Sequence, residues 1–479
     1  MDGRPPGRVT QALVNHYRNS TFHRSVTLKL KMIHVGSPIK IVFLALLSTT
    51  LPAALIVIRD VTVIDATGAP ARPHMSVVVA GRKITAIGRA SSIAVPKGAA
   101  VLNGSGKFLI PGLWDMHVHL WEKQPLFSLY IANGITGVRD MGSDFTQTTQ
   151  WRKHITAGKL TGPTIITSGP AVTGSNLSPG KLTVLRVTTP PDGENAANQL
   201  DDQDVDFITI LSNVPHDAYI SLAHRARILR LPFAGDVPDS VSMEEAIDAR
   251  QRSMEHLFLV LLACSSEEYD LRRNPSEITA AKLYETYDPR KAKALFQRFV
   301  RFDVWQVPTL TFRQRIDLIG IERLTTDQRL KYIPASIRTT WDDVKKISPN
   351  DLEAGKRDFA KCLELVAAMH AAGVPILAGT DTGDPWVLPG FALHDELALL
   401  VRAGMTPLEA IQTATLNPAR FLGLEATQGT IQKGKLADLI LLNANPLIDI
   451  QNTQKIDAVI LKGRLLNRHD LNNLLVPVK

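Results

Sequence analysis

Short apolar runs alternate with longer amphipathic segments through the middle of the chain, from about residue 110 to residue 424. We predict eight strands in this region, each followed by a segment able to form a helix: LIPGLWDMHVHL, ITGVRDM, PTIITSG, DFITIL, LPFAGD, RSMEHLF, WQVPTL and PILAGTDT. Eight β/α units in succession are typical of a parallel barrel, because each helix returns the chain to the start of the next strand. The pattern therefore predicts an α/β fold, a (β/α)8 TIM barrel, with any chemistry at the C-terminal ends of its strands.

Both ends of the folded chain have a different, β-rich pattern. Residues 55–109 contain LIVIRDVTVI, HMSVVVA, KITAIG and AVLNGSG, separated by turn residues, and residues 425–470 contain GTIQKGKLADLILLN and DAVILKGRLL. Short runs of this kind, bounded by Gly, Asp and Pro, predict strands. We therefore expect two β-rich segments that flank the barrel in the sequence.

Residues 1–54 form a basic extension that ends in a signal-like segment. The run IVFLALLSTTL at residues 41–51 follows Lys40 and precedes Pro52 and two alanines, which is typical of a secretory signal peptide. We therefore expect export, to the periplasm or the medium, and no stable membrane span. The alternative is a membrane anchor over residues 41–58, because the apolar character continues to Ile58.

The net charge of +8 is concentrated in that extension. Residues 1–40 contribute seven basic residues and one acid, so the remainder of the chain carries only +2. No basic stripe with interleaved aromatic residues is present, so we expect no nucleic-acid partner. Two cysteines, Cys264 and Cys362, exclude an all-cysteine zinc module, and their spacing leaves open whether they pair. Any metal ligands must then be His, Asp or Glu.

Three predicted strands end in residues suited to metal binding. His117 and His119 are two apart on a strand, so their imidazoles share one face and form half of a divalent-metal site. Asp381 ends the eighth strand, where it is a ligand, a general base or a helix N-cap. His256 ends the sixth strand, and the barrel would bring it to the same mouth. The alternative for each histidine is a hydrogen-bonded core residue.

The ordered set of motifs resembles the imidazolonepropionase-like, prolidase-like branch of the amidohydrolase superfamily over about residues 55–470. The resemblance rests on these stretches: PGLWDMHVHL, GITGVRDMG, DFITIL, LPFAGDVP, SMEHL, LAGTDTG, LHDELALLVRAGMTPLEAIQTATLNPARFLGL and GTIQKGKLADLILL. It implies a catalytic barrel at residues 110–424 and a small β-sandwich built from residues 55–109 and 425–470. Barrels of this kind are often oligomeric, so a homo-oligomer is an expected state.

The chain departs from the two-metal pattern of that family at two positions. Thr209 stands where the family has a carboxylated lysine, and Asp236 stands where it has a histidine on strand five. Without the bridging carbamate, two divalent cations would repel each other strongly in a site of low dielectric. The resemblance then implies one divalent ion, held by the ligands His117, His119, Asp236 and Asp381. We expect Zn²⁺ first, with Mn²⁺ or Fe²⁺ as alternatives, because carboxylate ligands also suit these ions.

The implied reaction is hydrolysis of a C–N bond in a small amide, cyclic amide or N-acyl compound by metal-activated water. In this interpretation Asp381 moves the proton and His256 donates a hydrogen bond to the oxyanion. The alternative is a catalytically inactive barrel that still binds a ligand, because two family ligand positions are substituted. We also expect Arg139 and Asp140 to form an internal ion pair beneath the site.

Overall fold

The alternating pattern of the middle of the chain folds into parallel strands surrounded by helices. The computed structural model describes residues 55–120, 126–174, 182–257, 259–317, 326–341 and 349–476. Seven of the eight predicted barrel strands are regular: β6 (Leu113–Val118), β7 (Ile135–Asp140), β8 (Thr164–Thr167), β11 (Ile208–Ile210), β12 (Phe233–Gly235), β13 (Ser253–Glu255) and β14 (Trp305–Val307). All seven are buried along their whole length, which explains why they appear as continuous apolar runs.

The eighth predicted strand, residues 375–382, closes the ring although it forms isolated bridges instead of a regular ladder. Gln306 pairs with Ile376 on one side, and Val118 pairs with Thr382 on the other, both in parallel. Between β8 and β11 the backbone N–H of Asp206 donates to the carbonyl of Thr167 at 3.0 Å. The strands β9 (Ala171–Thr173) and β10 (Val184–Arg186) extend the sheet beside β11.

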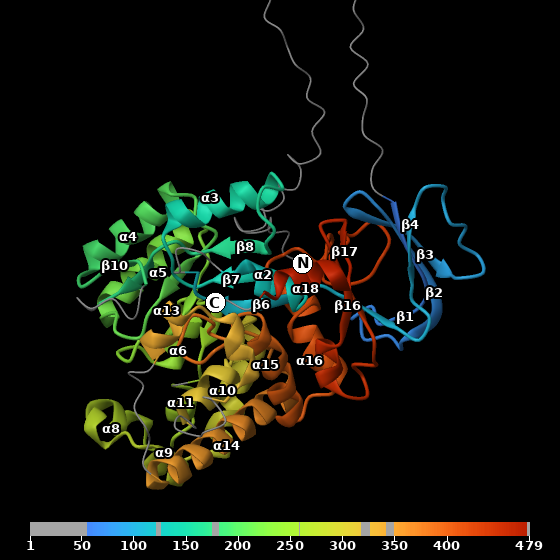
Figure 1. Ribbon diagram of the computed structural model, residues 1–479. Coiled ribbons are helices and arrows are strands. Elements are labelled where there is room, and N and C mark those ends of the chain that lie inside the picture. The colour runs from blue at the N-terminus through green and yellow to red at the C-terminus, as the bar shows by residue number, and fades with distance from the viewer. Residues whose placement is uncertain are drawn as a thin grey trace, which may run out of the picture.

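Helices follow these strands and lie outside the barrel (Figure 1). Helix starts carry the expected signals: Ser242 and Glu245 form a capping box at α6, and proline occupies the first turn of α4. The helices are α2 (Phe127–Ala132), α3 (Phe145–Thr156), α4 (Pro190–Asp202), α5 (His216–Leu229), α6 (Met243–Asp248), α7 (Val260–Ala263), α8 (Glu268–Arg273), α9 (Ala280–Glu285), α10 (Pro289–Phe302), α11 (Leu310–Asp317), α13 (Ala335–Arg338), α14 (Pro349–Ala371), α15 (Phe391–Arg402), α16 (Pro407–Thr413), α17 (Leu416–Phe421) and α18 (Arg468–Leu474). Short 3-10 turns are η1 (Pro275–Glu277), η2 (Gln328–Tyr332), η3 (Thr339–Trp341) and η4 (Ile450–Gln454).

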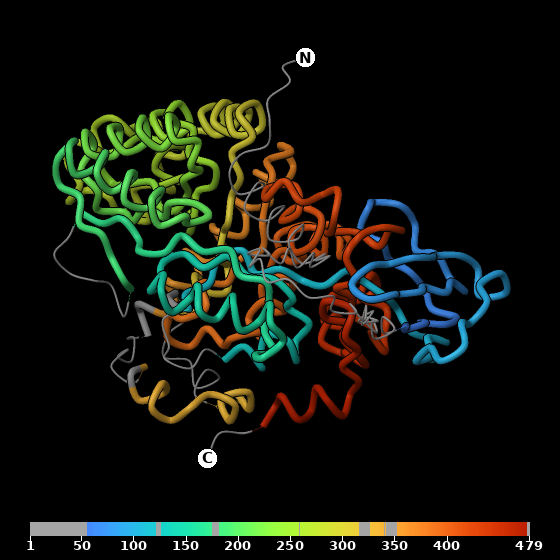
Figure 2. Tube along the Cα trace, turned by 90° about the horizontal axis from the view of Figure 1, so that it is seen from above, coloured from blue at the N-terminus to red at the C-terminus, as the bar shows by residue number. Residues whose placement is uncertain are grey.

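The two β-rich ends form one sheet beside the barrel, where blue and red segments lie together in both views (Figures 1 and 2). Its strands are β1 (Leu55–Val63), β2 (Arg72–Ala80), β3 (Lys83–Arg89), β4 (Ala100–Asn103), β5 (Phe108–Pro111), β15 (Leu439–Leu442), β16 (Ile456–Leu461) and β17 (Arg464–Leu466). Antiparallel pairing of β5 with β15 joins the two ends of the chain. The expected sandwich is thus one hydrogen-bonded sheet. It curls until Lys83 bridges to Leu436, and it encloses a core to which both ends contribute.

The structure describes only part of the N-terminal segment, and it shows both cysteines. The predicted export segment lies outside the described residues, and residues 55–58 of the alternative anchor open strand β1. No helix within the described ranges is long and apolar enough to cross a membrane. Cys264 and Cys362 do not form a disulfide with each other, so the pairing that the sequence left open is not made.

The interior of the barrel is packed with large side chains, among them Trp114, Met116, Trp305 and Leu377. Gly137 on β7 makes room for one of them, because a Cβ at this position would overlap the Trp114 ring. The missing side chain is therefore required by packing against a rigid indole in a closed space.

We expect the substitution Gly137→Ala to lower the free energy of unfolding by about 1–3 kcal/mol, the usual cost of overpacking a core. Urea unfolding followed by circular dichroism measures the change. The matched control is Gly88→Ala on β3, where the added Cβ would lie 3.1 Å from the flexible Cδ1 of Ile93. Equal stability of the Gly137→Ala and Gly88→Ala variants would contradict the packing argument.

Candidate metal centre

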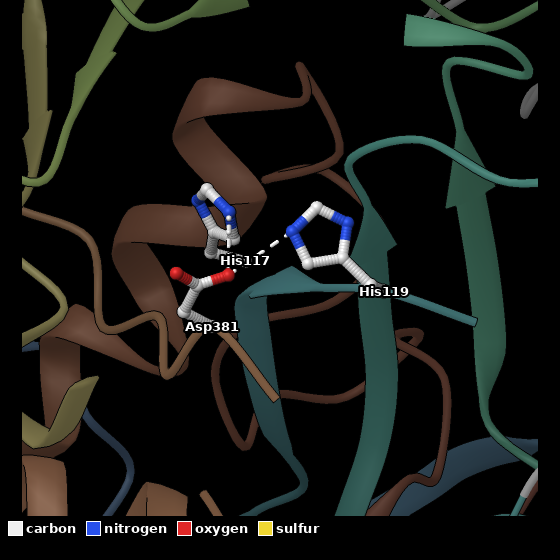
Figure 3. A group of neighbouring side chains, drawn as sticks. All are labelled: His117, His119 and Asp381. Atoms are coloured by element: carbon white, nitrogen blue, oxygen red, sulfur yellow. Dashed lines mark ion pairs between the residues drawn. The ribbon is translucent and has the colours of Figure 1, made fainter. Parts of the chain in front are cut away.

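Three side chains from two neighbouring strands converge at the C-terminal end of the barrel (Figure 3). His117 lies at the end of β6, His119 follows two residues later, and Asp381 comes from the adjacent eighth strand. Asp381 Oδ1 lies 3.2 Å from His117 Nε2 and 3.0 Å from His119 Nε2. One ligand atom from each of the three lies within 4.8 Å of the others, a spacing that suits a single metal ion.

Backbone strain turns the polar residues at the strand ends toward this mouth. Asp381 has φ 62°, His256 has φ 68° and Thr309 has φ 45°, all in the left-handed region that L-residues avoid. Each such conformation costs about 1–3 kcal/mol, and the surrounding structure has to hold it in place. The N–H of Asp381 donates to the carbonyl of His117 at 2.8 Å, and the N–H of His256 donates to Val307 at 3.0 Å. Strain of this kind clusters at functional sites.

A buried carboxylate fixes the orientation of the His117 ring. Glu255 Oε2 lies 2.9 Å from His117 Nδ1, so this contact fixes the ring with Nε2 facing the cluster, where Nε2 would be the nitrogen that binds a metal ion. Arg139 holds Glu255 in turn, at 2.9 Å from Nη2 to Oε1, and Ser253 donates to the same oxygen. Glu255 is a site residue that the sequence analysis missed, although its place on an inward-facing strand end beside His256 was a usable signal.

The expected ion pair between Arg139 and Asp140 is wrong. The two residues are neighbours on β7, so their side chains point to opposite faces of the sheet. Arg139 points inward to Glu255, whereas Asp140 accepts hydrogen bonds from the hydroxyls of Ser143 and Thr167.

The electrostatic field at the centre favours a cation. Burial alone would lower the pKa of His117, but Asp381 and Glu255 outweigh burial and raise this pKa to about 10. Burial would likewise raise the pKa of Asp381, but His117 and His256 hold it well below the usual range. Asp381 Oδ1 is buried, and no described residue forms a hydrogen bond to it with good geometry. Two imidazoles and one unsatisfied carboxylate oxygen in a field that stabilises positive charge fit a divalent ion.

His256 lies beside the three-residue cluster. Its ring centroid is 4.7 Å from that of His117, and its Nδ1 lies 2.8 Å from the hydroxyl of Thr309 and 3.7 Å from Asp381 Oδ2. Burial lowers the pKa of His256, which favours the neutral imidazole. The barrel thus brings His256 beside His117, which is 139 positions earlier in the sequence, and near Asp381, which is 125 positions later.

Asp236 lies on the far side of His256, outside the three-residue cluster. Its Oδ1 is 3.6 Å from His256 Nε2, and its Oδ2 accepts hydrogen bonds from the backbone and the hydroxyl of Ser212. The role of Asp236 as a fourth ligand stays a prediction, because Ser212 holds one carboxylate oxygen away from His117 and His119.

Thr209, at the position where the family has a lysine, points into the barrel. Its hydroxyl lies 3.9 Å from the sulfur of Met141. A threonine offers no amine that could form a carbamate, so a bridging anion cannot come from this position. Position 209 therefore holds a short side chain that contacts Met141.

A pocket of about 270 Å³ opens onto the cluster. The predicted site residues His117, His119, Asp236, His256, Asp381 and Thr209 all line it. Phe312 and Leu182 add apolar surface, and Asp384 adds a carboxyl group whose pKa burial and the neighbouring Asp381 raise well above the usual value. The sequence analysis did not name Asp384 among its candidate site residues.

The closed barrel and its His–His–Asp cluster define an α/β barrel with a candidate site for one metal ion. The amidohydrolase family model matches residues 289–466, which contain Asp381 and the C-terminal strands of the curled sheet. Ochratoxinase from Aspergillus niger is 25% identical over 394 residues, 73% of each chain. Imidazolonepropionase from Pseudomonas syringae pv. tomato is 37% identical over 84 residues, 17% of this chain and 21% of that protein.

Solved structures agree with this assignment at the level of the fold. Bottromycin amidohydrolase superposes with a TM-score of 0.67 and 20% identity over 88% of each chain. A Xaa-Pro dipeptidase with bound methionine superposes with a TM-score of 0.63 and 20% identity, over 86% of this chain and all of the other. The chain is thus similar to the amidohydrolase family over residues 289–466, and it shares the fold of these solved structures.

We expect Glu255→Gln to weaken metal binding by about 10–100-fold, the usual effect of losing the partner that orients a ligand histidine. Titration of the apoprotein with Zn²⁺ against a competing chelator measures the affinity. The control Glu244→Gln removes an exposed carboxylate and should leave the affinity unchanged.

Glu255→Gln also leaves the Arg139 cation buried without its carboxylate, so the free energy of unfolding should fall by about 3–5 kcal/mol. The double variant Glu255→Gln, Arg139→Met removes both charges and should regain much of that stability without regaining the metal affinity. If the double variant regained metal affinity together with stability, the result would contradict an orienting role for Glu255.

Proposed function

We propose that this protein is a metal-dependent hydrolase of C–N bonds in small amides, cyclic amides or N-acyl compounds, with a mononuclear site. The observation that carries the proposal is the convergence of His117, His119 and Asp381 at the catalytic end of an amidohydrolase barrel. The pocket beside the cluster has the size of a small-molecule site, which supports a small substrate.

The residues present suit one divalent ion better than two. His117, His119 and Asp381 would hold it, and Asp236 is the candidate fourth ligand. When bound, a divalent ion lowers the pKa of a coordinated water and polarises a carbonyl. Thr209 supplies no bridging ligand, so nothing at that position would offset the repulsion between two cations.

In the proposed reaction Asp381 and His256 perform different tasks. Asp381 lines the pocket, its Oδ2 lies 3.7 Å from His256 Nδ1, and its lowered pKa keeps it ionised, so it would take a proton and return it to the leaving nitrogen. The neutral His256 imidazole, held by the Thr309 hydroxyl, would donate a hydrogen bond to the developing oxyanion. Phe312 would exclude water on one side, since its ring lies 5.4 Å from that of His256.

The substrate class follows from the surroundings of the cluster. Leu182 and Phe312 give the pocket apolar surface, and Asn213 gives it a polar amide group. Such a site suits a compound with an apolar body and a few polar groups. The names of the relatives, an ochratoxinase and a Xaa-Pro dipeptidase, support an amide-type bond as the target.

A second candidate function is ligand binding without catalysis. Two features favour it: Thr209 stands where the resemblance implies a carboxylated lysine, and Asp236 Oδ2 accepts a hydrogen bond from the Ser212 hydroxyl. A barrel of this kind would retain the pocket and lose the rate enhancement.

Metal content separates the two functions. We expect about one equivalent of Zn²⁺, Mn²⁺ or Fe²⁺ in the purified protein by plasma mass spectrometry, and none in the double variant His117→Ala, His119→Ala. A screen of N-acyl amino acids and dipeptides should then show hydrolysis by the wild type alone. Two equivalents would overturn the mononuclear site. Failure to bind any of the three ions after loading would favour the non-catalytic barrel.

Asp381→Asn tests the proton transfer. We expect kcat to fall by about 10²–10⁴-fold, the usual contribution of general acid–base catalysis, measured with whichever amide the screen identifies. Metal analysis of the same sample shows whether the ion is still bound, so that lost chemistry is separated from lost metal. Asp202→Asn, an exposed carboxylate on α4, is the control and should retain the wild-type rate.

A further inference from the structure

A second cavity, of about 260 Å³, lies between the barrel and the curled sheet. Three segments that are far apart in the sequence line it: residues 152–165 around the start of β8, the β2–β3 turn, and the end of β16 with β17 (Figure 1). The β8 residues that line the cavity, Thr164 and Ile165, are at the N-terminal end of that strand. The candidate metal centre lies at the opposite, C-terminal end of the barrel, so the two sites are separate.

Every ionisable side chain that lines this cavity is a cation. The four residues are Arg82, Arg152, Lys462 and Arg464. Arg152 forms a bidentate ion pair with Asp206, at 3.0 Å from Nη1 to Oδ2 and 3.4 Å from Nη2 to Oδ1. Asp206 itself does not line the cavity. Two carboxylates, Asp206 and the Asp438 that lies beside Lys462, offset only two of the four charges, so the cavity keeps a positive potential.

Lys462 is held in the cavity wall by its backbone. It has φ 52°, and its N–H donates to Asp438 Oδ1 at 2.6 Å. Burial lowers the pKa of its ammonium group to about 8, although the nearby Asp438 opposes that shift. A cation whose hydration is reduced in this way gains from an anionic partner that enters from solvent.

The remaining wall of the cavity is mixed. Leu160, Pro163 and Leu466 give apolar surface, and Thr161 gives a hydroxyl. Inorganic anions would use only the cationic part of such a wall, whereas a ligand with an apolar body would also bury the leucine surface.

We propose that this cavity is a binding site for a small organic anion, with a carboxylate or phosphate head beside Lys462 and Arg464 and an apolar body against Leu160 and Leu466. Guanidinium groups suit both heads, because their planar N–H forks match two oxygens of either anion. The site is independent of the proposed hydrolase activity, and its ligand need not be a substrate.

Isothermal titration of the full-length protein with phenylacetate, phenyl phosphate and inorganic phosphate tests the proposal. The titrations use the His117→Ala, His119→Ala variant, so that anions cannot bind at the metal centre. Phenylacetamide serves as the neutral probe of the same shape as phenylacetate. We expect phenylacetate or phenyl phosphate to bind in one site, more tightly than inorganic phosphate, and phenylacetamide not to bind. Whichever of the two organic anions binds more tightly identifies the head group.

Two variants locate the binding site. Arg464→Ala removes an exposed cation, and Lys462→Gly removes the half-buried one while suiting the left-handed backbone. Each variant should lower the affinity for the organic anion by about ten-fold, the usual effect of losing a charge-assisted hydrogen bond. Arg89→Ala, an exposed cation on β3 of the same sheet, is the matched control and should bind as the parent does.

Two results would overturn the proposal. One is the absence of organic-anion binding in the parent protein, which would make the cavity a packing gap between barrel and sheet. The other is an equal loss of organic-anion affinity in Arg464→Ala and Arg89→Ala, which would show that the effect comes from the general charge of the surface. Neither result bears on the hydrolase activity, which is measured separately by metal content and amide hydrolysis.

Discussion

The candidate site depends on the closure of the barrel between β6 and residues 375–382. Hydrogen bonds from Asp381 N–H to the His117 carbonyl, and from His119 N–H to the Thr382 carbonyl, align the two strands. This alignment brings Asp381, in its strained left-handed conformation, opposite the two imidazoles. Without it, a carboxylate and two histidines separated by more than 260 residues would have no reason to meet. The closed ring therefore holds the ligands at the spacing a metal ion needs.

Buried charge supports this arrangement from within the barrel. Arg139, Glu255 and His117 form a chain of charge-assisted hydrogen bonds that crosses the interior from β7 to β13 and β6. Burying these groups costs free energy, and their mutual contacts offset that cost only while all partners are present. The network therefore couples the orientation of one candidate ligand to the stability of the barrel. This coupling is typical of second-layer residues around metal sites.

The curled sheet joins the two ends of the chain to the bottom and side of the barrel. Pairing of β5 with β15 requires that the barrel bring residues 108–111 near residues 439–442. The cationic cavity is a consequence of this docking, since its walls come from β8 on one side and from β16 and β17 on the other. The molecule thus has a candidate metal centre at the C-terminal end of the barrel and a cavity lined by cations near the N-terminal end of β8.

The sequence by itself determined the strands and their order, because buried parallel strands require continuous apolar runs and helices require a different period. It also identified His117, His119, His256 and Asp381, since polar residues that end apolar runs are conspicuous. It could not determine which of them meet. Export through residues 1–54 stays a prediction, because that segment lies outside the described residues.

Only the tertiary structure decided that Arg139 pairs with Glu255 and not with Asp140, and that Asp236 bonds to Ser212 beside His256. It also decided that the two chain ends share one curled sheet and enclose a cationic cavity. The physical reason is the range of the interactions. Strand and helix patterns arise from neighbours along the chain, whereas ion pairs, ligand clusters and cavities arise from contacts across a closed barrel whose registers and side-chain directions no local pattern records.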